Sequence, residues 1–353
     1  MASGSDGAGR RRLFSELAGL ADAATNETAA RLDRLYAPDA QWLGSHPLNA
    51  AQGPEVIATR VWVPLKVSLP DLERRDLIFV GGDYRDAQFI AAMGHYCGTF
   101  VREWLGIPAT GRPVYLRYGE VHRIAAGRIA ARWCLWDVLD LIRQAGHWPI
   151  APSLGVEGMW PGPLTGNGLR LDGGDPVTGA ASLAQTLEMQ HTLGTHDDEK
   201  RLGRKGLLEM DQRLHWHAKM NWYGPAGIGT TRGLAGFVDD HQLPFRNAFP
   251  NRKGGAQISD PSLGGHYIRI GDGPYSVTGG WPSVRARHLG GSLFGVGATG
   301  KEVTLRVMDF YLHHEGLIRE NWVPIDVLDM LMQMGVDVLD RLKRQVRPES
   351  AWQ

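Results

Sequence analysis

Two stretches of this sequence place carboxylates near tryptophan, a combination that can raise a carboxyl pKa into the range used in general acid/base catalysis. Trp133 lies among the candidates of the first stretch, and Trp322 lies among those of the second. An acid and a base on one wall of a cavity could take a proton from an activated carbon and return it. The candidate catalytic residues are Glu120, His122 and Asp137 in the first stretch, and Asp309, Tyr311 and Asp326 in the second.

Each stretch is typical of an antiparallel hairpin, because alternating β-type runs flank the short turns AAGR and HEGL. If Ile124 lies opposite Ile129, then Glu120 lies opposite Trp133, and the same rule places Asp309 opposite Trp322. Opposed residues share a face of a sheet, as do residues two apart. We therefore expect two acidic and aromatic faces, one with Tyr118, Glu120, His122, Trp133, Leu135 and Asp137, the other with Asp309, Tyr311, Glu320, Trp322 and Asp326.

The same carboxylates could instead have purely structural roles. Asp137 and Asp326 could be first-turn residues of the following helix, where the helix dipole favours a carboxylate. Glu120 and Asp309 could be solvent-exposed strand residues, and a register slip of one residue would turn every strand side chain to the other face.

The segment GWPSVRARH (280–288) adds basic residues to the second stretch. Its arginines could hold a phenolate, carboxylate or enolate, or they could form a solvated strand face. The related segment HYCGTF contains His95 but no arginine pair, so we expect the second stretch to be the better catalyst. These considerations add His288 as a catalytic candidate, and Trp133, Trp222, His266, Trp281, Arg285, Arg287 and Trp322 as substrate-binding candidates.

Both stretches belong to an internal repeat. ATGRPVYLR at 109–117 matches ATGKEVTLR at 298–306, and the match continues without a gap until Gly146 pairs with Gly335. An upstream block, which pairs Trp42 with Trp222, matches at a slightly smaller offset. Because the order of the blocks is preserved, the pattern indicates duplication of one domain.

The order of the patterns within each copy predicts the fold class. Apolar residues at helical spacing come first, a Gly- and Pro-rich middle follows, and alternating strand patterns precede a last helix. Helices before a run of strands favour an α+β fold over a parallel sheet. The expected organisation is a disordered tail at 1–12, a domain at 13–148, a Pro/Gly-rich linker at 149–180, a second domain at 181–343 and a tail at 344–353.

Composition excludes several classes of function. Lys+Arg and Asp+Glu both number 38, so no basic excess favours a nucleic-acid partner. Two cysteines, Cys97 and Cys134, cannot form a disulfide framework or a cysteine zinc site. The pairs His215-Trp-His217 and His313-His314 lack a third metal ligand at a standard spacing. No signal peptide or bilayer-spanning segment is evident, so we expect a cytoplasmic protein without a membrane partner, metal or other cofactor.

The repeated motifs also carry a family resemblance. The series A-T-G-[RK], an acidic strand, G-x-I, W-x-x-x-D and Q-x-G resembles the SnoaL-like, polyketide-cyclase-type branch of the nuclear-transport-factor-2-like superfamily. The resemblance covers both halves of the chain. It implies two tandem cone-shaped domains, each a curved antiparallel sheet wrapped around helices with a deep pocket, and a homo-oligomer through the sheet faces.

The resemblance further implies cofactor-independent acid/base chemistry on an aromatic or polycyclic small molecule. The cyclases close rings by an intramolecular aldol step and use an Asp near the start of the last helix, which corresponds to Asp137 and Asp326. Their sheet supplies aromatic and His positions, from which Glu120 and Asp309 depart. Related members are dehydratases, isomerases, epoxide hydrolases and lyases that release formaldehyde from lignin-derived aromatics. The alternative function is a non-catalytic binding or dimerisation module on the same fold.

Overall fold

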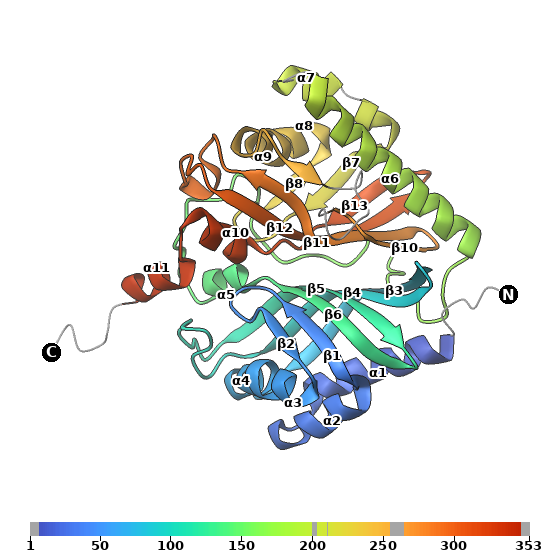
Figure 1. The fold of residues 1–353 in the computed structure, drawn as a ribbon, viewed down its shortest axis with the longest axis vertical. Coiled ribbons are helices and arrows are strands. Elements are labelled where there is room, and N and C mark those ends of the chain that lie inside the picture. Colours follow the sequence, from blue (N-terminus) through green and yellow to red (C-terminus); the bar gives the residue numbers. More distant parts are fainter. Residues whose placement is uncertain (1–6, 200–202, 210, 255–264, 347–353) are drawn as a thin grey trace.

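The computed structural model describes residues 7–199, 203–209, 211–254 and 265–346, which form two sheets with helices on their outer sides (Figure 1). The predicted α+β class is confirmed. Each sheet is an open path of six strands, and a short extra strand pairs with the second sheet. Among the described residues, no helix is long and apolar enough to cross a membrane.

The first sheet has the strand order β2-β1-β6-β5-β4-β3, in which only β1 and β6 are parallel neighbours. Its strands are β1 (Tyr36–Gly44), β2 (Ala50–Gln52), β3 (Glu73–Tyr84), β4 (Ala87–Thr99), β5 (Pro113–Ala125) and β6 (Arg128–Trp136). Its helical segments are α1 (Gly7–Asp22), η1 (Thr25–Glu27), α2 (Thr28–Leu35), α3 (Pro54–Ile57), η2 (Ala58–Trp62), α4 (Val63–Ser68) and α5 (Val138–Gln144).

The second sheet repeats this topology with the order β10-β11-β12-β13-β7-β8, and β7 and β13 are its parallel neighbours. Its strands are β7 (Trp216–Tyr223), β8 (Thr230–Arg232), β9 (Lys253–Gly254), β10 (Ile268–Asp272), β11 (Tyr275–Arg287), β12 (Glu302–His314) and β13 (Leu317–Trp322). Its helical segments are α6 (Pro176–Glu199), α7 (Arg204–Glu209), η3 (Asp211–Leu214), α8 (Gly233–Phe237), η4 (Val238–Gln242), α9 (Leu243–Ala248), η6 (Leu293–Gly295), α10 (Val327–Met334) and α11 (Val338–Gln345).

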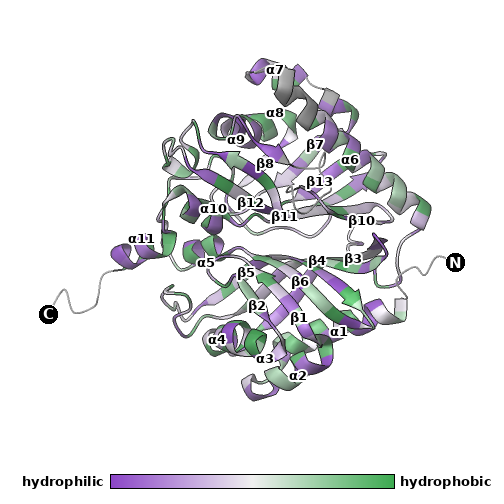
Figure 2. Ribbon diagram, in the orientation of Figure 1, coloured by the Kyte–Doolittle hydropathy of each residue, from purple (hydrophilic) through white to green (hydrophobic). Residues whose placement is uncertain are grey.

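The two sheets pack against each other through their helix-free faces (Figure 1). Hydrophobic residues lie along the strands of both sheets, whereas α11 is largely polar (Figure 2). The shared cluster includes Val80 and Val121 from the first sheet and Ile270, Phe310 and Trp322 from the second. Burial of these side chains is the main source of attraction between the halves. The sheet faces that were expected to meet a partner chain therefore cover each other within this chain.

The segments that join and flank the halves are more ordered than predicted. Helix α1 already starts at Gly7, so the predicted tail at 1–12 is helical from that residue, and residues 1–6 lie outside the described part. Helix α6 starts at Pro176, inside the predicted linker. The linker also packs on the second half, since Trp160 is buried and donates from Nε1 to the Gly224 carbonyl at 3.0 Å. Of the predicted tail at 344–353, residues 347–353 lie outside the described part.

The predicted hairpin register is wrong beyond the turns. Ile124 does face Ile129, but an irregularity between Arg123 and Ile124 shifts the pairing, so that Val121 and not Glu120 lies opposite Trp133. A shift between Leu312 and His313 places Phe310 opposite Trp322. One extra residue reverses the face of every later side chain. The predicted acidic and aromatic faces are therefore split, and Trp133, Leu135, Glu320 and Trp322 lie on the opposite side of their sheets from Glu120 and Asp309.

Candidate active site

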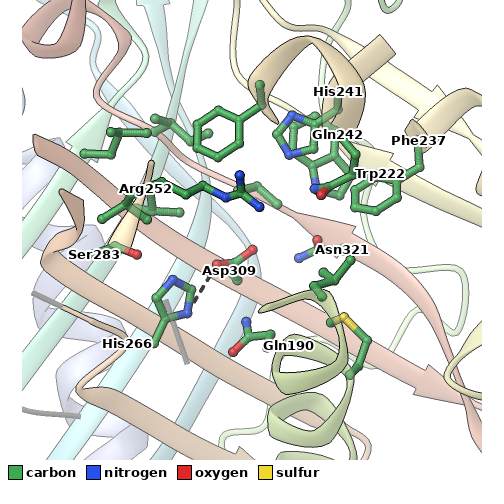
Figure 3. A pocket seen from close by; sticks show the side chains of 18 of the residues that line it. Gln190, Trp222, Phe237, His241, Gln242, Arg252, His266, Ser283, Asp309 and Asn321 are labelled. Atoms are coloured by element: carbon green, nitrogen blue, oxygen red, sulfur yellow. Dashed lines mark ion pairs between the residues drawn. The ribbon is translucent and has the colours of Figure 1, made fainter. Parts of the chain in front are cut away.

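A cavity of about 210 Å³ lies in the second half, between the sheet and the helices that cover it (Figure 3). Its floor comes from β11, β12 and β13, and its walls come from α6, η4, α9 and the segments beside β9 and β10. The lining is largely apolar and aromatic, with polar groups at one end. Its polar and aromatic residues include Gln190, Trp222, Phe237, His241, Phe245, Arg246, Arg252, His266, Ser283, Asp309, Tyr311 and Asn321.

Asp309 is the carboxyl group of this cavity. It lies in β12, where strand alternation turns Asp309 and Tyr311 towards the helices and the intervening Phe310 towards the other sheet. Asp309 is only 7% exposed. Burial raises its pKa from 3.8 to about 7, while hydrogen bonds with Tyr311 and Asn321 limit the rise. Near neutral pH this carboxyl group is therefore able to both accept and release a proton.

His266 is the second polar group at this end. Its Nδ1 lies 3.8 Å from Asp309 Oδ2 and 3.0 Å from Thr278 Oγ1. Burial, and then the charge of Arg269, lowers the pKa of His266 to about 3. The ring is therefore neutral when Asp309 titrates, and it can act as a hydrogen-bond donor or acceptor but not as a fixed cation.

The wall opposite Asp309 is aromatic. Trp222 from β7 stacks on His241 with ring centroids 4.0 Å apart and an angle of 16° between the planes. Phe237 and Phe245 pack against the same His241 ring. His241 belongs to the π-helical segment η4, a type of helix that often occurs at functional sites. The cavity therefore has a stack of aromatic rings on the side away from Asp309.

Basic side chains also reach the cavity. Figure 3 shows Arg252 extending between Asp309 and His241. Arg246 on α9 donates to the Leu193 carbonyl at 2.9 Å, and burial, together with the charge of Arg252, lowers its pKa to about 9. These arginines are not the pair that the sequence suggested. Arg285 and Arg287 point away from the cavity, and exposed Arg287 pairs with Glu302 at 2.9 Å, as expected of a solvated strand face.

The matching position of the first half has a different environment. Glu120 occupies the place of Asp309 in the repeat and also points to the helix side, but it is fully buried in a polar cluster. Arg132 forms a very short contact with it, Arg74 donates at 2.7 Å and Tyr96 at 3.0 Å. Burial alone would raise the pKa of Glu120, but Arg132 and Arg74 hold it well below its usual range.

Aromatic rings fill the space around this cluster. Trp42, Trp62 and Trp136 pack edge to face, with centroids 5.6 to 6.5 Å apart. His122 lies 3.5 Å from Glu120, and burial lowers its pKa to about 4. Glu120 is therefore held as an ionised structural carboxylate, unlike Asp309.

Asp137 and Asp326 are helix N-caps that also join the halves. Asp137 accepts from Asp140 N at 3.0 Å and from Ala226 N of the second half at 2.8 Å. Asp326 accepts from Asp329 N at 3.1 Å and from His46 N of the first half at 2.9 Å.

Both capping carboxylates also face an arginine. Arg117 lies 2.8 Å from Asp137, and Arg306 lies 2.9 Å from Asp326. Burial raises the pKa of Asp326 to about 6, although Arg306 favours its ionised form. Asp326 is not among the cavity-lining residues, and all its observed contacts are structural.

Four of the predicted site residues come together in the cavity, namely Asp309, Tyr311, His266 and Trp222. His288 does not line it; this side chain is fully buried against Phe249 and lies 3.2 Å from Thr299. Trp281 packs beside the interface of the sheets, with Arg306 4.8 Å above its ring. Trp322 donates to the Pro161 carbonyl at 3.1 Å, outside the cavity. In the described part of the chain, no three His, Cys, Asp or Glu side chains are grouped to hold a metal ion.

Sequence reasoning missed several lining residues, among them Gln190, Arg252 and Asn321. Asn321 could have been found, because it occupies the place of Arg132 in the repeat and faces Tyr311 in the corrected register. His241 lies upstream of the segment 280–288, and the upstream block of the repeat places it next to the position of Trp62. Gln190 lies on a helix with no distinctive motif, so the sequence contains no comparable signal for it.

Comparison with known proteins points to one family for the first half. Residues 16–145 match the family of SnoaL-like polyketide cyclases. The chain is similar to IdmH, a candidate polyketide cyclase from Streptomyces antibioticus, with 24% identity over 38% of this chain and 99% of that one, at a TM-score of 0.31. It is also similar to TsrD from Streptomyces laurentii, with 23% identity over 39% and 96% of the two chains, at a TM-score of 0.32. Among curated proteins, no sequence matches the chain.

Proposed function

We propose that the second half of this chain is a cofactor-independent acid/base enzyme of the cyclase or isomerase type. The observation that carries the proposal is Asp309, a buried carboxyl group with a pKa of about 7 at the polar end of an aromatic cavity. The match of residues 16–145 to cyclases, together with the internal repeat, supports a reaction of this class.

The residues suggest a definite division of roles. Asp309 in its carboxylate form accepts a proton from a carbon next to a carbonyl group, and the electron pair of the broken C–H bond moves to the carbonyl oxygen. Neutral His266 donates a hydrogen bond to the resulting enolate oxygen. The enolate carbon then either attacks a second carbonyl, whose oxygen takes the proton from Asp309, or takes the proton back from Asp309 at a new position. Aldol closure and isomerisation differ only in this second step.

The cavity also suggests the substrate class. Trp222 and His241 form a stacked wall, so we propose a substrate with at least one flat ring that carries a ketone. Retro-aldol release of formaldehyde or loss of water could use the same proton transfers, and both remain variants of this proposal.

Proton abstraction can be tested without the natural substrate. Exchange of the hydrogens next to the carbonyl of 1-tetralone in D2O, followed by proton NMR, measures this step alone. We expect Asp309→Asn to slow catalysed exchange by roughly 10²–10⁴, the usual contribution of a general base. The matched control is Glu120→Gln, which changes the corresponding carboxylate of the first half.

The outcomes separate an enzyme from a binding module. Exchange that depends on Asp309 and survives Glu120→Gln supports the proposal. If 1-tetralone binds in the cavity but no exchange above background occurs, or if Asp309→Asn exchanges as fast as wild type, the proposal is wrong. Binding without exchange would favour a non-catalytic module.

A further inference from the structure

Gln190 connects the two polar groups at the end of the cavity. It lies in α6, and its Nε2 is 2.8 Å from Tyr311 Oη and 2.9 Å from Thr278 Oγ1. Tyr311 is hydrogen-bonded to Asp309, and Thr278 lies 3.0 Å from His266 Nδ1. Two hydrogen-bond chains therefore start at the same amide and end at Asp309 and His266. Figure 3 shows Gln190 beneath these groups.

Counting protons gives these chains a direction. An amide NH2 has two N–H donors, and here both are used, one on each hydroxyl oxygen. Tyr311 therefore accepts from Gln190 and keeps its single proton for Asp309. If the amide were reversed, Gln190 Oε1 would need the protons of both hydroxyls, and Tyr311 would have none for Asp309. The Tyr311–Asp309 hydrogen bond thus favours the orientation with Nε2 towards Tyr311.

The same amide also bears on the tautomer of His266, through Thr278. Thr278 also accepts from Gln190 and keeps its single proton, for which His266 Nδ1 and Tyr311 are both hydrogen-bonding neighbours; when that proton goes to His266, Nδ1 is an acceptor. A neutral imidazole that accepts at Nδ1 carries its proton on Nε2. That proton is then available for an oxygen of a bound molecule, as the proposed enolate step requires.

We propose that Gln190 is a positioning residue, which directs the Tyr311 proton to Asp309 and holds His266 as the tautomer with its proton on Nε2. The catalytic benefit of this arrangement rests on the proposed function, but the Asp309 midpoint and the His266 tautomer can be measured without any substrate. The groups that face Asp309 are His266, Tyr311, Asn321 and, across the cavity, Arg252. Of these, only Tyr311 accepts a hydrogen bond from Gln190.

The test compares two substitutions in one helix. Gln190→Met removes both N–H donors at similar side-chain length, and it also removes Oε1, which is buried without a hydrogen-bond partner among the described residues. Gln185→Met is the matched control. Gln185 binds His313 Nδ1 at 2.9 Å and the Gly316 carbonyl at 2.8 Å, and it does not line the cavity.

Two readouts on the full chain are informative. Infrared titration follows the protonated Asp309 carboxyl band, which is assigned by its loss in Asp309→Asn. Nitrogen NMR reports the tautomer of His266, which is assigned by its loss in His266→Asn. In Gln190→Met the Tyr311 hydroxyl is free to turn away, so the Asp309 midpoint should rise by about one pH unit as a hydrogen bond to the carboxylate weakens. The His266 signal should change from one tautomer to a mixture.

Gln185→Met should change neither readout. If Gln190→Met leaves both signals as in wild type, or if Gln185→Met shifts them equally, Gln190 has no specific positioning role and the proposal is wrong. The proposed function fails separately. Loss of Asp309 without loss of proton exchange would refute the enzyme assignment, while the midpoint and tautomer shifts would still decide the role of Gln190.

Discussion

Replacing Asp309 by Asn should make the protein more stable at alkaline pH, while it removes the proposed catalytic group. In the folded chain the pKa of Asp309 is raised from 3.8 to about 7 by burial. The folded state therefore keeps this proton between about pH 4 and 7, whereas the unfolded state loses it. Because the folded state binds more protons in that window, stability falls as the pH rises through it and levels off above about pH 7.

The size of the effect follows from the shift. One pKa unit corresponds to about 1.36 kcal/mol, so a rise from 3.8 to about 7 amounts to roughly 4 kcal/mol at pH 8. Asn has nearly the same shape and never ionises. We expect Asp309→Asn to exceed wild type by roughly 2–4 kcal/mol at pH 8 and to differ by less than about 1 kcal/mol at pH 4.

Urea unfolding across pH 4 to 8.5 measures this difference. Other groups whose pKa is shifted in the folded state, such as Asp326 and His266, are present in both proteins. Their contributions to the pH dependence of the free energy of unfolding therefore largely cancel in the comparison. A variant that is less stable than wild type at pH 8 would show that Asp309 is held as an ionised structural carboxylate. In that case the reasoning that makes it the proton carrier would be refuted.

Three further predictions concern two carboxylates that lie outside the cavity and the pH dependence of the reaction. Glu120→Gln should lower the free energy of unfolding, measured in urea, by roughly 3–5 kcal/mol, because Arg74 and Arg132 lose their buried partner. Turnover per folded molecule should nevertheless stay within a few-fold of wild type, and a large drop in kcat would contradict this prediction. Asp326→Asn should also keep turnover within a few-fold, since Asn still caps α10; a loss of roughly 10² or more in kcat would return the catalytic role to Asp326. The pH profile of kcat/KM should rise through about pH 7 as Asp309 ionises, and a bell centred elsewhere would point to another base.

The sequence was sufficient to predict the class of fold. The internal repeat, the helical spacing of Leu13, Leu17 and Leu20 and the late strand patterns all describe periodic burial, and the three leucines are indeed buried. Such periodicity reflects which side chains must leave water, so it can be read without coordinates.

The composition of the site could be predicted only in part. Asp309 and Tyr311 were identified, but Trp322 was placed beside them because the pairing was counted from the turn without a bulge. A bulge is set by the packing of the whole sheet and leaves no trace in the alternation of residue types. Glu120 and Asp309 have different neighbours, and these neighbours come from other strands and helices. The local sequence around either carboxylate therefore does not show the difference.

The contact between the sheets within one chain has a consequence for how the two halves can change. In a pair of identical subunits, every substitution appears in both members. A substitution that improves the cavity of one subunit but harms packing in the other therefore always has both effects. Here the two halves are encoded separately, so a substitution in one half leaves the other half unchanged. Because both halves belong to one chain, their pairing does not depend on protein concentration. Arg132 and Asn321 occupy matching positions and can therefore have different roles. Arg132 pairs with the buried carboxylate of Glu120, whereas Asn321 lines the cavity.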